Sequence, residues 1–451
     1  MKIKFWGGVG EVTGSNHLLE DQNNKILIDC GMFQGADQAF EKNSADFSYD
    51  PHEIEGVLIT HAHIDHIGRL PKLVRDGFDK NIYSTAPTKD MAYHLLLDSY
   101  AIMSKNFATK NMVIYDEADI AKTMSLWKVV PYHHKFSIKN FDIEYIDAGH
   151  ILGSASLRIT SGNNKILFSG DLGNVPSPIV KDTEYFTESA DYALLESTYG
   201  ARIHESASNR KQLLKDHIID AVRKKSVLLI PAFAMERTQE LLYEINDMVE
   251  KKELPAVPIF VDSSLSIKLT KIYDKYSSDP NFFDQEAIKL IKAGDDIFNF
   301  AGLTYTPTVE ESKKINDFPA PKVIIASSGM SEGGRIIHHE VRYLPDPNAT
   351  ILFVGFQAYG SKGRQVLDGA KKIQILGQEI DIKAQVKKIG GYSAHADQPL
   401  LLKWAKESKN GLKKMFITHG DLDQAQILAK KVNDETGVET IIPGFGQTIE
   451  L

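Results

Sequence analysis

Three histidines and one aspartate lie close together in the run Ile59-Thr60-His61-Ala62-His63-Ile64-Asp65-His66. The run follows an apolar segment, residues 56–59, which is typical of a buried strand. Catalytic groups are common on loops at the ends of strands, and imidazole and carboxylate are ligand types that suit zinc. We therefore interpret the run as a metal-binding loop and not as a set of unrelated surface or core histidines.

The spacing within this loop predicts two neighbouring metal sites. Alternate residues of an extended chain point the same way, so His61 and His63 can close on one ion. The next turn carries Asp65 and His66 towards a second ion. The only cysteine, Cys30, excludes an internal disulfide and is consistent with a reducing compartment, so histidine and carboxylate must hold the metal.

The composition describes a large globular protein. The chain has 451 residues, and 42% of them are hydrophobic, which is enough to bury more than one core. No apolar run approaches the roughly 18 residues that a membrane span requires, and the N-terminus lacks the apolar core of a signal peptide. We expect a cytoplasmic protein with no membrane partner. The formal charge of -8 argues against indiscriminate coating of nucleic acid but leaves a local basic groove open.

The glycine-rich segment of residues 7–14 superficially resembles a dinucleotide-binding fingerprint. No helical pattern follows these glycines, which the fingerprint requires. We therefore expect a tight hairpin between a strand that begins at Ile3 and a second strand at residues 17–19.

Several segments with the pattern of strands end in a polar side chain, and this pattern recurs near both ends of the chain. The residues at these strand ends are Asp29, His150, Asp171, Glu196 and His419. Asp29 is either a turn former or a brace for the histidine loop, and we favour the brace. His419 is far from His61 in sequence but follows the same kind of strand, so we interpret the middle of the chain as an insertion into one metal domain.

The middle of the chain alternates helices with strands of the buried type. The strands are expected at residues 226–230, 258–261, 322–326 and 349–354. This alternation predicts a mainly parallel sheet with helices on both faces. Thr238 and Asp262 look like N-caps of two of the helices. We assign residues 1–199 and 393–451 to the metal domain and residues 200–392 to the insertion.

Seven motifs together resemble a known family. The metal loop, with Asp29 before it and His150 and Asp171 after it, resembles the signature of the metallo-β-lactamase superfamily. The segments 196–200, 393–395 and 418–420 resemble the further motifs of its β-CASP branch, which includes the cleavage and polyadenylation endonuclease, bacterial RNase J and related RNA-degrading nucleases. The resemblance implies an α/β fold, an αββα sandwich of two sheets split by an inserted α/β domain.

The resemblance also implies which residues bind two zinc ions per chain. The first ion would be held by His61, His63 and His150, the second by Asp65, His66 and His419, with Asp171 as the bridge. A hydroxide shared by the two ions would attack the phosphorus of a phosphodiester, which makes Asp65 part of the catalytic set. His395 would assist the leaving oxygen while Glu196 fixes its ring. The alternative is that His395 begins a helix and Glu196 is a structural cap.

Three further residues are candidates for contacts with the substrate. Ser393 and Ser328 lie in segments that resemble family motifs, and each offers a hydroxyl to a phosphate oxygen. Arg335 presents a fork of donors that suits a backbone phosphate, although a solvated helix face would also explain it. The chain departs from the family pattern at Glu236, where glycine is expected.

The function that the resemblance implies is a zinc-dependent ribonuclease acting on single-stranded RNA as an endonuclease, an exonuclease or both. His419 favours RNA, because the DNA-repair members of the family carry an apolar residue there. The alternatives are a DNA nuclease of the same superfamily, a non-catalytic RNA-processing subunit, and a hydrolase of small thioesters or lactams. The sequence shows neither the RNA-binding extension of archaeal members nor the C-terminal domain of RNase J, and assembly as a homodimer is left open.

Overall fold

The computed structural model describes residues 1–35, 38–106, 113–358 and 360–451. The chain forms two compact units. Unit 1 comprises Met1–Val175, Val180–Ile203 and His395–Leu451, and unit 2 comprises Pro176–Ile179 and His204–Ala394. The domain boundaries expected after residues 199 and 392 lie close to the changes of unit after residues 203 and 394, whereas the short segment Pro176–Ile179 was not expected to join unit 2.

Unit 1 contains two seven-stranded sheets. The first has the order β22 (Thr448–Glu450), β1 (Lys2–Phe5), β2 (His17–Asp21), β3 (Asn24–Ile28), β4 (Ile54–Leu58), β5 (Asn81–Ser84) and β6 (Trp127–Val129). The second has the order β21 (Glu439–Ile441), β20 (Lys414–Thr418), β11 (Tyr192–Glu196), β10 (Asn164–Phe168), β9 (Ala155–Ser161), β8 (Phe141–Asp147) and β7 (Phe136–Ile138). Side chains from both sheets, among them Phe5, Leu157 and Phe416, are buried in one apolar cluster, so the sheets pack face to face.

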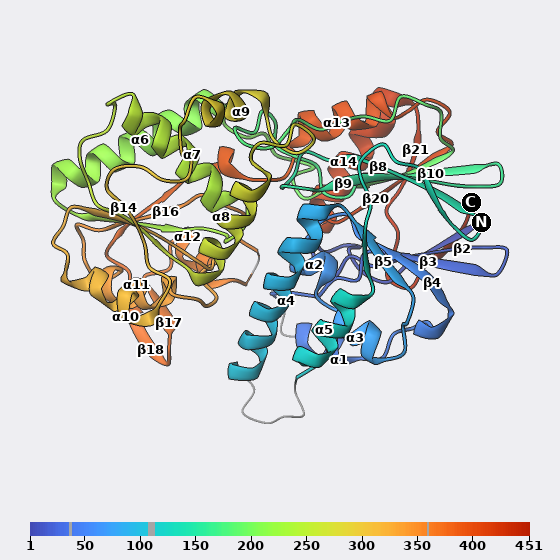
Figure 1. Ribbon diagram of the computed structural model, residues 1–451, viewed down its shortest axis with the longest axis horizontal. Coiled ribbons are helices and arrows are strands. Elements are labelled where there is room, and N and C mark those ends of the chain that lie inside the picture. Colours follow the sequence, from blue (N-terminus) through green and yellow to red (C-terminus); the bar gives the residue numbers. More distant parts are fainter. Residues whose placement is uncertain (36–37, 107–112, 359) are drawn as a thin grey trace. The chain divides into compact units, whose positions relative to one another are not determined.

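Helices flank these two sheets in Figure 1. On the second sheet, α13 (Gln398–Glu407) and α14 (Leu422–Thr436) bury Trp404 and Leu428 in one cluster with Leu167 and Ile417. Beside the first sheet lie α1 (Ala39–Ser44), α2 (Ile64–Ile67), α3 (Leu70–Arg75), α4 (Ala86–Asn106) and α5 (Glu117–Ser125). The αββα sandwich is confirmed.

Strands β1 and β2 pair antiparallel, with Phe5 opposite His17. The predicted hairpin is therefore present, but the connection runs over the whole glycine-rich segment and is not a tight turn. Gly8, Gly10 and Gly14 adopt positive φ angles of 62°, 68° and 80° within it. The segment leaves the sheet to reach the other end of the chain, where the carbonyl of Gly8 accepts a hydrogen bond of 2.6 Å from the backbone N–H of His419.

Unit 2 is built on a six-stranded sheet in which every pair of neighbours is parallel. Its order is β14 (Leu303–Tyr305), β13 (Ile259–Asp262), β15 (Lys322–Ala326), β12 (Val227–Pro231), β16 (Thr350–Phe353) and β19 (Gln385–Lys388). Figure 1 shows helices on both faces. They are α6 (Ala207–Lys224), α7 (Arg237–Glu250) and α8 (Ser264–Tyr276) on one face, and α10 (Val309–Lys314), α11 (Ile336–Tyr343) and α12 (Lys362–Leu367) on the other. The mainly parallel, doubly covered sheet is confirmed.

Two local predictions for unit 2 are wrong. Asp262 is the last residue of β13, and the N-cap of α8 is Ser263, whose hydroxyl accepts from the N–H of Ser266. Thr238 lies inside α7, whose N-cap is Glu236. Glu236 has a φ of 60°, which explains why glycine is the residue expected there. Its carboxylate accepts a hydrogen bond from the Tyr273 hydroxyl.

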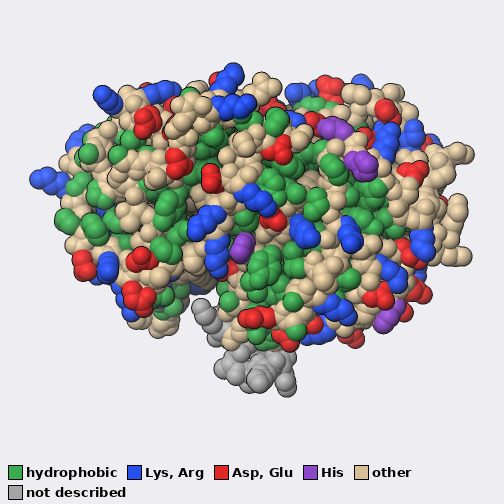
Figure 2. All heavy atoms as spheres, in the orientation of Figure 1, with side chains coloured by type: hydrophobic (Ala, Val, Ile, Leu, Met, Phe, Trp, Pro, Cys, Tyr) green, Lys and Arg blue, Asp and Glu red, His purple; other side chains and the backbone are tan. Residues whose placement is uncertain are grey.

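Positive and negative side chains are interspersed over the face drawn in Figure 2. This mixture agrees with a formal charge of -8 that comes from 52 basic and 60 acidic residues. Among the described residues, no helix is both long enough and apolar enough to cross a membrane.

Candidate metal centre

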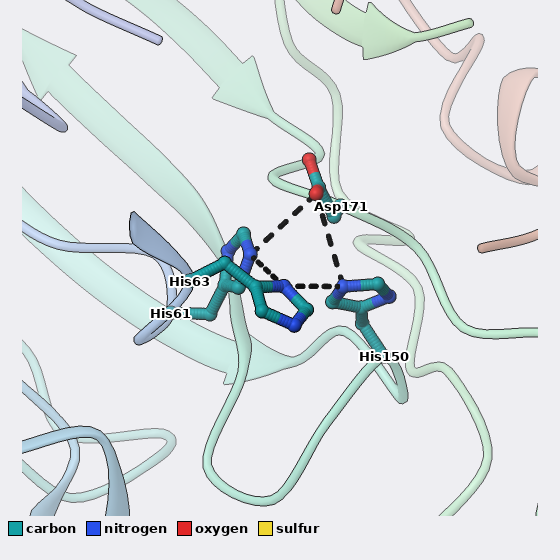
Figure 3. Close-up of side chains that lie close together, drawn as sticks. All are labelled: His61, His63, His150 and Asp171. Carbon is teal, nitrogen blue, oxygen red and sulfur yellow. Dashed lines mark hydrogen bonds and ion pairs between the residues drawn. The ribbon is translucent and has the colours of Figure 1, made fainter. Parts of the chain in front are cut away.

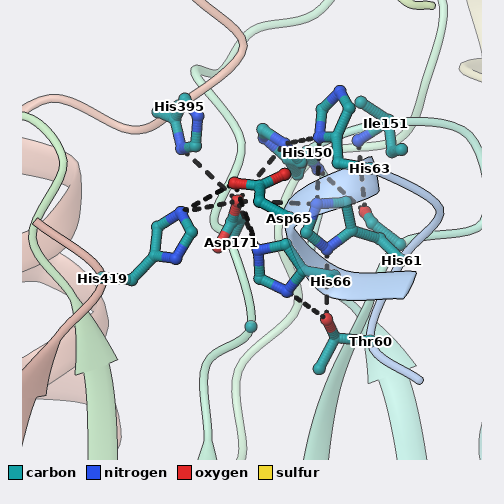
Figure 4. Close-up of polar contacts among 12 residues, drawn as sticks. Thr60, His61, His63, Asp65, His66, His150, Ile151, Asp171, His395 and His419 are labelled. Carbon is teal, nitrogen blue, oxygen red and sulfur yellow. Dashed lines mark hydrogen bonds and ion pairs between the residues drawn. The ribbon is translucent and has the colours of Figure 1, made fainter. Parts of the chain in front are cut away.

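The candidate side chains of unit 1 come together at the ends of its strands. His61 and His63 follow β4, and α2 begins one residue later and carries Asp65 and His66. The other side chains are supplied by loops after strands of the second sheet. They are His150 after β8, Asp171 after β10 and His419 after β20. All seven predicted ligands therefore meet where the two sheets end, as Figure 4 shows.

One group of donor atoms is formed by His61, His63, His150 and Asp171, whose ligand atoms all lie within 4.8 Å of one another. Nδ1 of His63 is 2.9 Å from Nε2 of His61 and 3.2 Å from Nε2 of His150. Oδ2 of Asp171 is 3.5 Å from Nε2 of His61 and 3.8 Å from Nε2 of His150. Figure 3 shows the three rings and the carboxylate pointing at a common centre.

A second group is formed by Asp65, His66 and His419. Oδ2 of Asp65 is 4.0 Å from Nε2 of His66 and 3.9 Å from Nε2 of His419. Oδ2 of Asp171 lies 3.4 Å from His66 and 3.3 Å from His419. The same oxygen of Asp171 thus faces both groups, which is the position expected of a bridging ligand.

The chemistry of these atoms fits bound cations. Nε2 of His66, Nε2 of His419 and Oδ1 of Asp171 are buried and have no hydrogen-bond partner among the described residues. Burial lowers the pKa of His63 to about 4 and that of His61 well below its ordinary value, so both rings are neutral and offer lone pairs. These unprotonated nitrogens crowd one another in the first group, and a divalent cation removes their repulsion. In the second group burial opposes protonation of His66, but Asp171 and Asp29 outweigh it and raise its pKa well above the ordinary value.

Asp171 is ionised in this environment. Burial alone would raise the pKa of its carboxyl, but the histidines around it, first of all His419 and then His66, hold that pKa well below the usual value. The carboxylate is 2% exposed. A buried negative charge at the junction of the two groups adds to the affinity of the site for cations.

In two histidines of the loop, His61 and His66, the Nδ1 atom faces away from the donor groups. Each of these two atoms has a hydrogen-bonding partner. Nδ1 of His66 is 2.7 Å from Oδ2 of Asp29, and Nδ1 of His61 is 3.1 Å from Oγ1 of Thr60. Asp29 in turn accepts from the backbone N–H and the hydroxyl of Thr60, both at 2.8 Å. Asp29 is therefore placed where a brace for the histidine loop is expected, and this role stays a prediction. Thr60 is a partner that the sequence analysis missed although it directly precedes His61.

His395 and Glu196 also lie beside the metal centre. Nδ1 of His395 is 3.4 Å from the Glu196 carboxylate and 3.8 Å from Oδ2 of Asp171. Glu196 ends β11, is buried, and is itself fixed by the backbone N–H of Leu172 at 2.7 Å. Burial lowers the pKa of His395, but the carboxylates, led by Glu196, outweigh it and the net shift is upward. Such a ring can carry a proton, and the side chain is 16% exposed.

The three predicted substrate contacts belong to unit 2. The Ser328 hydroxyl accepts from the backbone N–H groups of Glu332 and Gly333. Arg335 donates to Oδ1 of Asp262 at 2.8 Å and to the carbonyl of Pro307 at 2.9 Å. Ser393 is buried in the segment that joins unit 2 to His395. The structure thus gives Arg335 a partner within its own unit, and phosphate binding by these residues stays a prediction.

Comparison with known families and proteins follows the same division of the chain. The metallo-beta-lactamase superfamily matches residues 9–198, the Beta-Casp domain matches residues 238–366, and the Zn-dependent metallo-hydrolase RNA specificity domain matches residues 379–443. Together these matches extend over both units.

Several similar proteins match along the whole chain. Ribonuclease TTHA0252 of Thermus thermophilus is 33% identical over 451 residues, covering 100% of both chains. The RNase J-like protein of Methanocaldococcus jannaschii is 28% identical and covers 100% of this chain and 99% of its own. Transcription termination factor FttA of Methanosarcina mazei is 28% identical over 98% of this chain and 70% of its own. A protein of unknown function from Enterococcus faecalis V583 shares the fold, with a TM-score of 0.55 at 11% identity, covering 100% of this chain and 99% of that one.

Proposed function

Because this chain belongs to the β-CASP branch of the metallo-β-lactamase superfamily, we propose that it is a metal-dependent ribonuclease that hydrolyses the phosphodiester bonds of single-stranded RNA. The observation that carries the proposal is the pair of adjoining donor groups that share Asp171. The full-length similarity to a protein named ribonuclease supports RNA as the substrate. The match to an RNA specificity domain supports it independently.

We propose that the centre holds two zinc ions. His61, His63 and His150 would hold one, Asp65, His66 and His419 would hold the other, and Asp171 would touch both. Nitrogen and carboxylate donors in sets of three or four suit zinc. The only cysteine of the sequence, Cys30, belongs to neither donor group, and burial raises the pKa of its thiol to about 12. Two such ions would supply an activated water and neutralise the charge that develops on the phosphoryl oxygens.

The side chains around this centre have separate tasks. Asp29 and Thr60 hold the rings of His66 and His61 in fixed tautomers, which keeps the donor atoms in place. His395 is exposed along one edge and lies beside Asp171, so it is placed to give a proton to the departing oxygen. Glu196 orients the ring of His395 and favours its protonated form. Asp65 contributes to catalysis as a ligand.

The proposal includes contacts of Ser328, Ser393 and Arg335 with the RNA backbone. Hydroxyl and guanidinium groups are ordinary partners of phosphate oxygens. Arg335 also donates to the carbonyl of Thr306, and it still has donors beyond these three bonds. Its side chain is 18% exposed. We also propose a cytoplasmic location, a homodimer, and a metal domain of residues 1–199 and 393–451 interrupted by residues 200–392. Light scattering on the purified protein tests the dimer.

The decisive experiment compares substrates at equal concentration. The purified chain is incubated with single-stranded RNA and with DNA of the same sequence, before and after dialysis against a chelator. We expect rapid cleavage of RNA, much slower cleavage of DNA, and loss of both after chelation with recovery on addition of zinc. Equal rates on RNA and DNA would reject the RNA assignment and favour a DNA nuclease.

The mode of cleavage needs a second set of substrates. Circular RNA has no ends, so its cleavage would establish endonuclease activity directly. RNA labelled at either end, with a monophosphate or a triphosphate at the 5′ terminus, reports exonuclease polarity and end preference. Elemental analysis of the same preparation measures zinc per chain, and a protein that binds no metal would point to a non-catalytic subunit.

A further inference from the structure

His17 is a buried histidine beneath the metal centre that the proposed chemistry does not use. It begins β2, and only 4% of its surface is exposed. Its ring packs edge-on against Phe5 at 5.6 Å between centroids and lies 6.5 Å from Phe168. Both phenylalanines belong to the apolar cluster between the two sheets. Nothing in the sequence around the glycine-rich segment marks this histidine as functional.

The ring of His17 carries an unsatisfied polar atom. Its Nδ1 is buried and has no hydrogen-bond partner among the described residues. A buried nitrogen without a partner destabilises the folded protein, and an apolar residue would fit the surrounding phenylalanines without that cost. The chain thus keeps a polar ring at a place where packing alone favours an apolar one.

The ring of His419 also has a nitrogen that lacks a hydrogen-bond partner among the described residues. Its Nε2 faces Asp171 at 3.3 Å and belongs to the second donor group, while its Nδ1 is buried without a partner. A histidine that binds a metal through Nε2 carries its hydrogen on Nδ1, and that N–H normally donates to a neighbouring acceptor. His66 and His61 have Asp29 and Thr60 for this purpose, but His419 has no such group among the described residues.

The two unsatisfied rings belong to the same part of unit 1. The backbone N–H of Ser15, two residues before His17, donates to the carbonyl of Asp65 at 2.9 Å. The Phe5 ring that packs against His17 lies 5.7 Å from the ring of Phe416, three residues before His419. Burial, with smaller effects from His66 and His419, lowers the pKa of His17 to about 3, so its imidazole is neutral and has one nitrogen that accepts a hydrogen bond. Other nearby polar groups are engaged elsewhere: Ser197 donates to the carbonyl of Thr418 at 2.8 Å, and Asp29 is occupied by Thr60 and His66.

We propose that His17 positions His419 as a metal ligand by accepting, through one buried water, the hydrogen bond of the His419 Nδ1–H. A water is the natural link because the two nitrogens have no direct bond, and buried waters bridge polar atoms that lack other partners. This inference rests on the proposed metal-dependent function. It adds a positioning residue to that function. This residue, His17, lies near the start of the sequence, whereas His419 lies near its end.

The test measures zinc affinity, not activity. His17→Phe keeps a ring of similar shape without nitrogen, and His17→Asn keeps a polar group near the position of Nδ1. Competition with a chromogenic chelator gives the affinity of each zinc ion. We expect His17→Phe to weaken one of the two ions by about 10–100-fold, with the other unchanged, and His17→Asn to recover part of the loss.

Phe168→Leu serves as the matched control, because it disturbs the packing around His17 but leaves the nitrogen in place. It should lower thermal stability without changing the affinity for zinc. Two zinc ions bound to His17→Phe as tightly as to the wild type would overturn the inference and leave the proposed function standing. Equal weakening by His17→Phe, His17→Asn and Phe168→Leu would also overturn it, because the effect would then be one of packing. Wild-type protein that binds no zinc would reject the proposed function as well.

Discussion

Asp171 in unit 1 and Asp262 in unit 2 are both buried aspartates at the end of a strand, and both face histidine. The oxygens of Asp262 lie 2.7–2.8 Å from four hydrogen-bond donors: Thr306 Oγ1, Ser312 Oγ, Arg335 Nη1 and His339 Nε2. Oδ2 of Asp171 lies 3.3–3.8 Å from the ring nitrogens of His61, His66, His150, His395 and His419. Oδ1 of Asp171 has no hydrogen-bond partner in the part of the chain that the structure describes.

The difference lies in the hydrogens that surround each carboxylate. Asp262 is surrounded by donors at hydrogen-bonding distance, and their bonds outweigh its burial and lower its pKa to about 2. Asp171 is surrounded by atoms at longer distances, several of which offer lone pairs and not hydrogens. The same residue types at strand ends thus make a closed structural network in one unit and a centre suited to cations in the other. The following predictions test this contrast, beginning with the largest expected effect.

Asp171→Asn should remove the shared ligand of the two donor groups. The neutral amide lacks the charge that attracts both ions, so we expect zinc to fall below two ions per chain. Metal ions contribute several kcal/mol to such reactions, so cleavage of RNA should slow by about 10³-fold or more. Elemental analysis and single-turnover rates measure the two effects. A variant that keeps two ions and normal activity would contradict the bridging role.

His395→Ala should slow the reaction without releasing metal. Loss of a general acid lowers kcat by about 10²–10⁴-fold, whereas the seven side chains that we propose as ligands are unchanged. His395 also forms a group with Asp171 and His419 whose ligand atoms lie within 4.8 Å of one another, so the zinc content decides between the two roles. Glu196→Gln should also lower kcat without releasing metal. The decrease should be smaller, because the change weakens only the orientation and charge of His395. If His395→Ala lost zinc in proportion to activity, the histidine would be a ligand and not a proton donor.

Asp262→Ala should destabilise unit 2 and leave the metal centre intact. The change leaves the Arg335 guanidinium and the His339 ring without their shared acceptor. Breaking a buried charged network in this way costs about 3–5 kcal/mol of the free energy of unfolding. Urea unfolding measures the loss, and zinc analysis at low denaturant provides the contrast with Asp171→Asn. Loss of zinc without loss of stability would show that the two aspartates do not differ as described.

These two aspartates also mark how far the sequence alone could lead. The candidate ligands of unit 1 were predictable because four of them lie in one short run and the others directly follow strands of a recognisable pattern. The role of Asp262 was not, because its partners Thr306, Arg335 and His339 follow 44 or more residues later and come together only in the folded sheet. The N-cap prediction at Asp262 was wrong because β13 continues through that residue. His17 has no sequence signal, since its position becomes informative only when the fold brings β2 beside the metal loop and Phe5 against Phe416.

The prediction with the smallest expected effect concerns Glu340 in unit 2. Glu340 is a buried polar residue outside the metal centre. One carboxyl oxygen is bonded by the Ser331 hydroxyl, and the other is buried without a partner. Burial raises the pKa of Glu340 to about 8. The folded protein therefore keeps the carboxyl protonated between about pH 4.5 and pH 8, where the unfolded chain ionises it, so the free energy of unfolding falls as the pH rises through this range.

Glu340→Gln removes this titration and keeps a neutral group of the same shape beside Ser331. We expect the variant to be more stable than the wild type at pH 8 by roughly 1–3 kcal/mol, with the difference shrinking towards pH 4.5. Thermal unfolding at several pH values measures it, and Glu310→Gln, at an exposed glutamate of α10 in the same unit, is the control. A stability difference that did not change with pH would mean that Glu340 is already ionised in the folded protein. The ionised carboxylate would then need a cation beside it. In that case Glu340 would resemble the buried carboxylate of Asp171 more than that of Asp262.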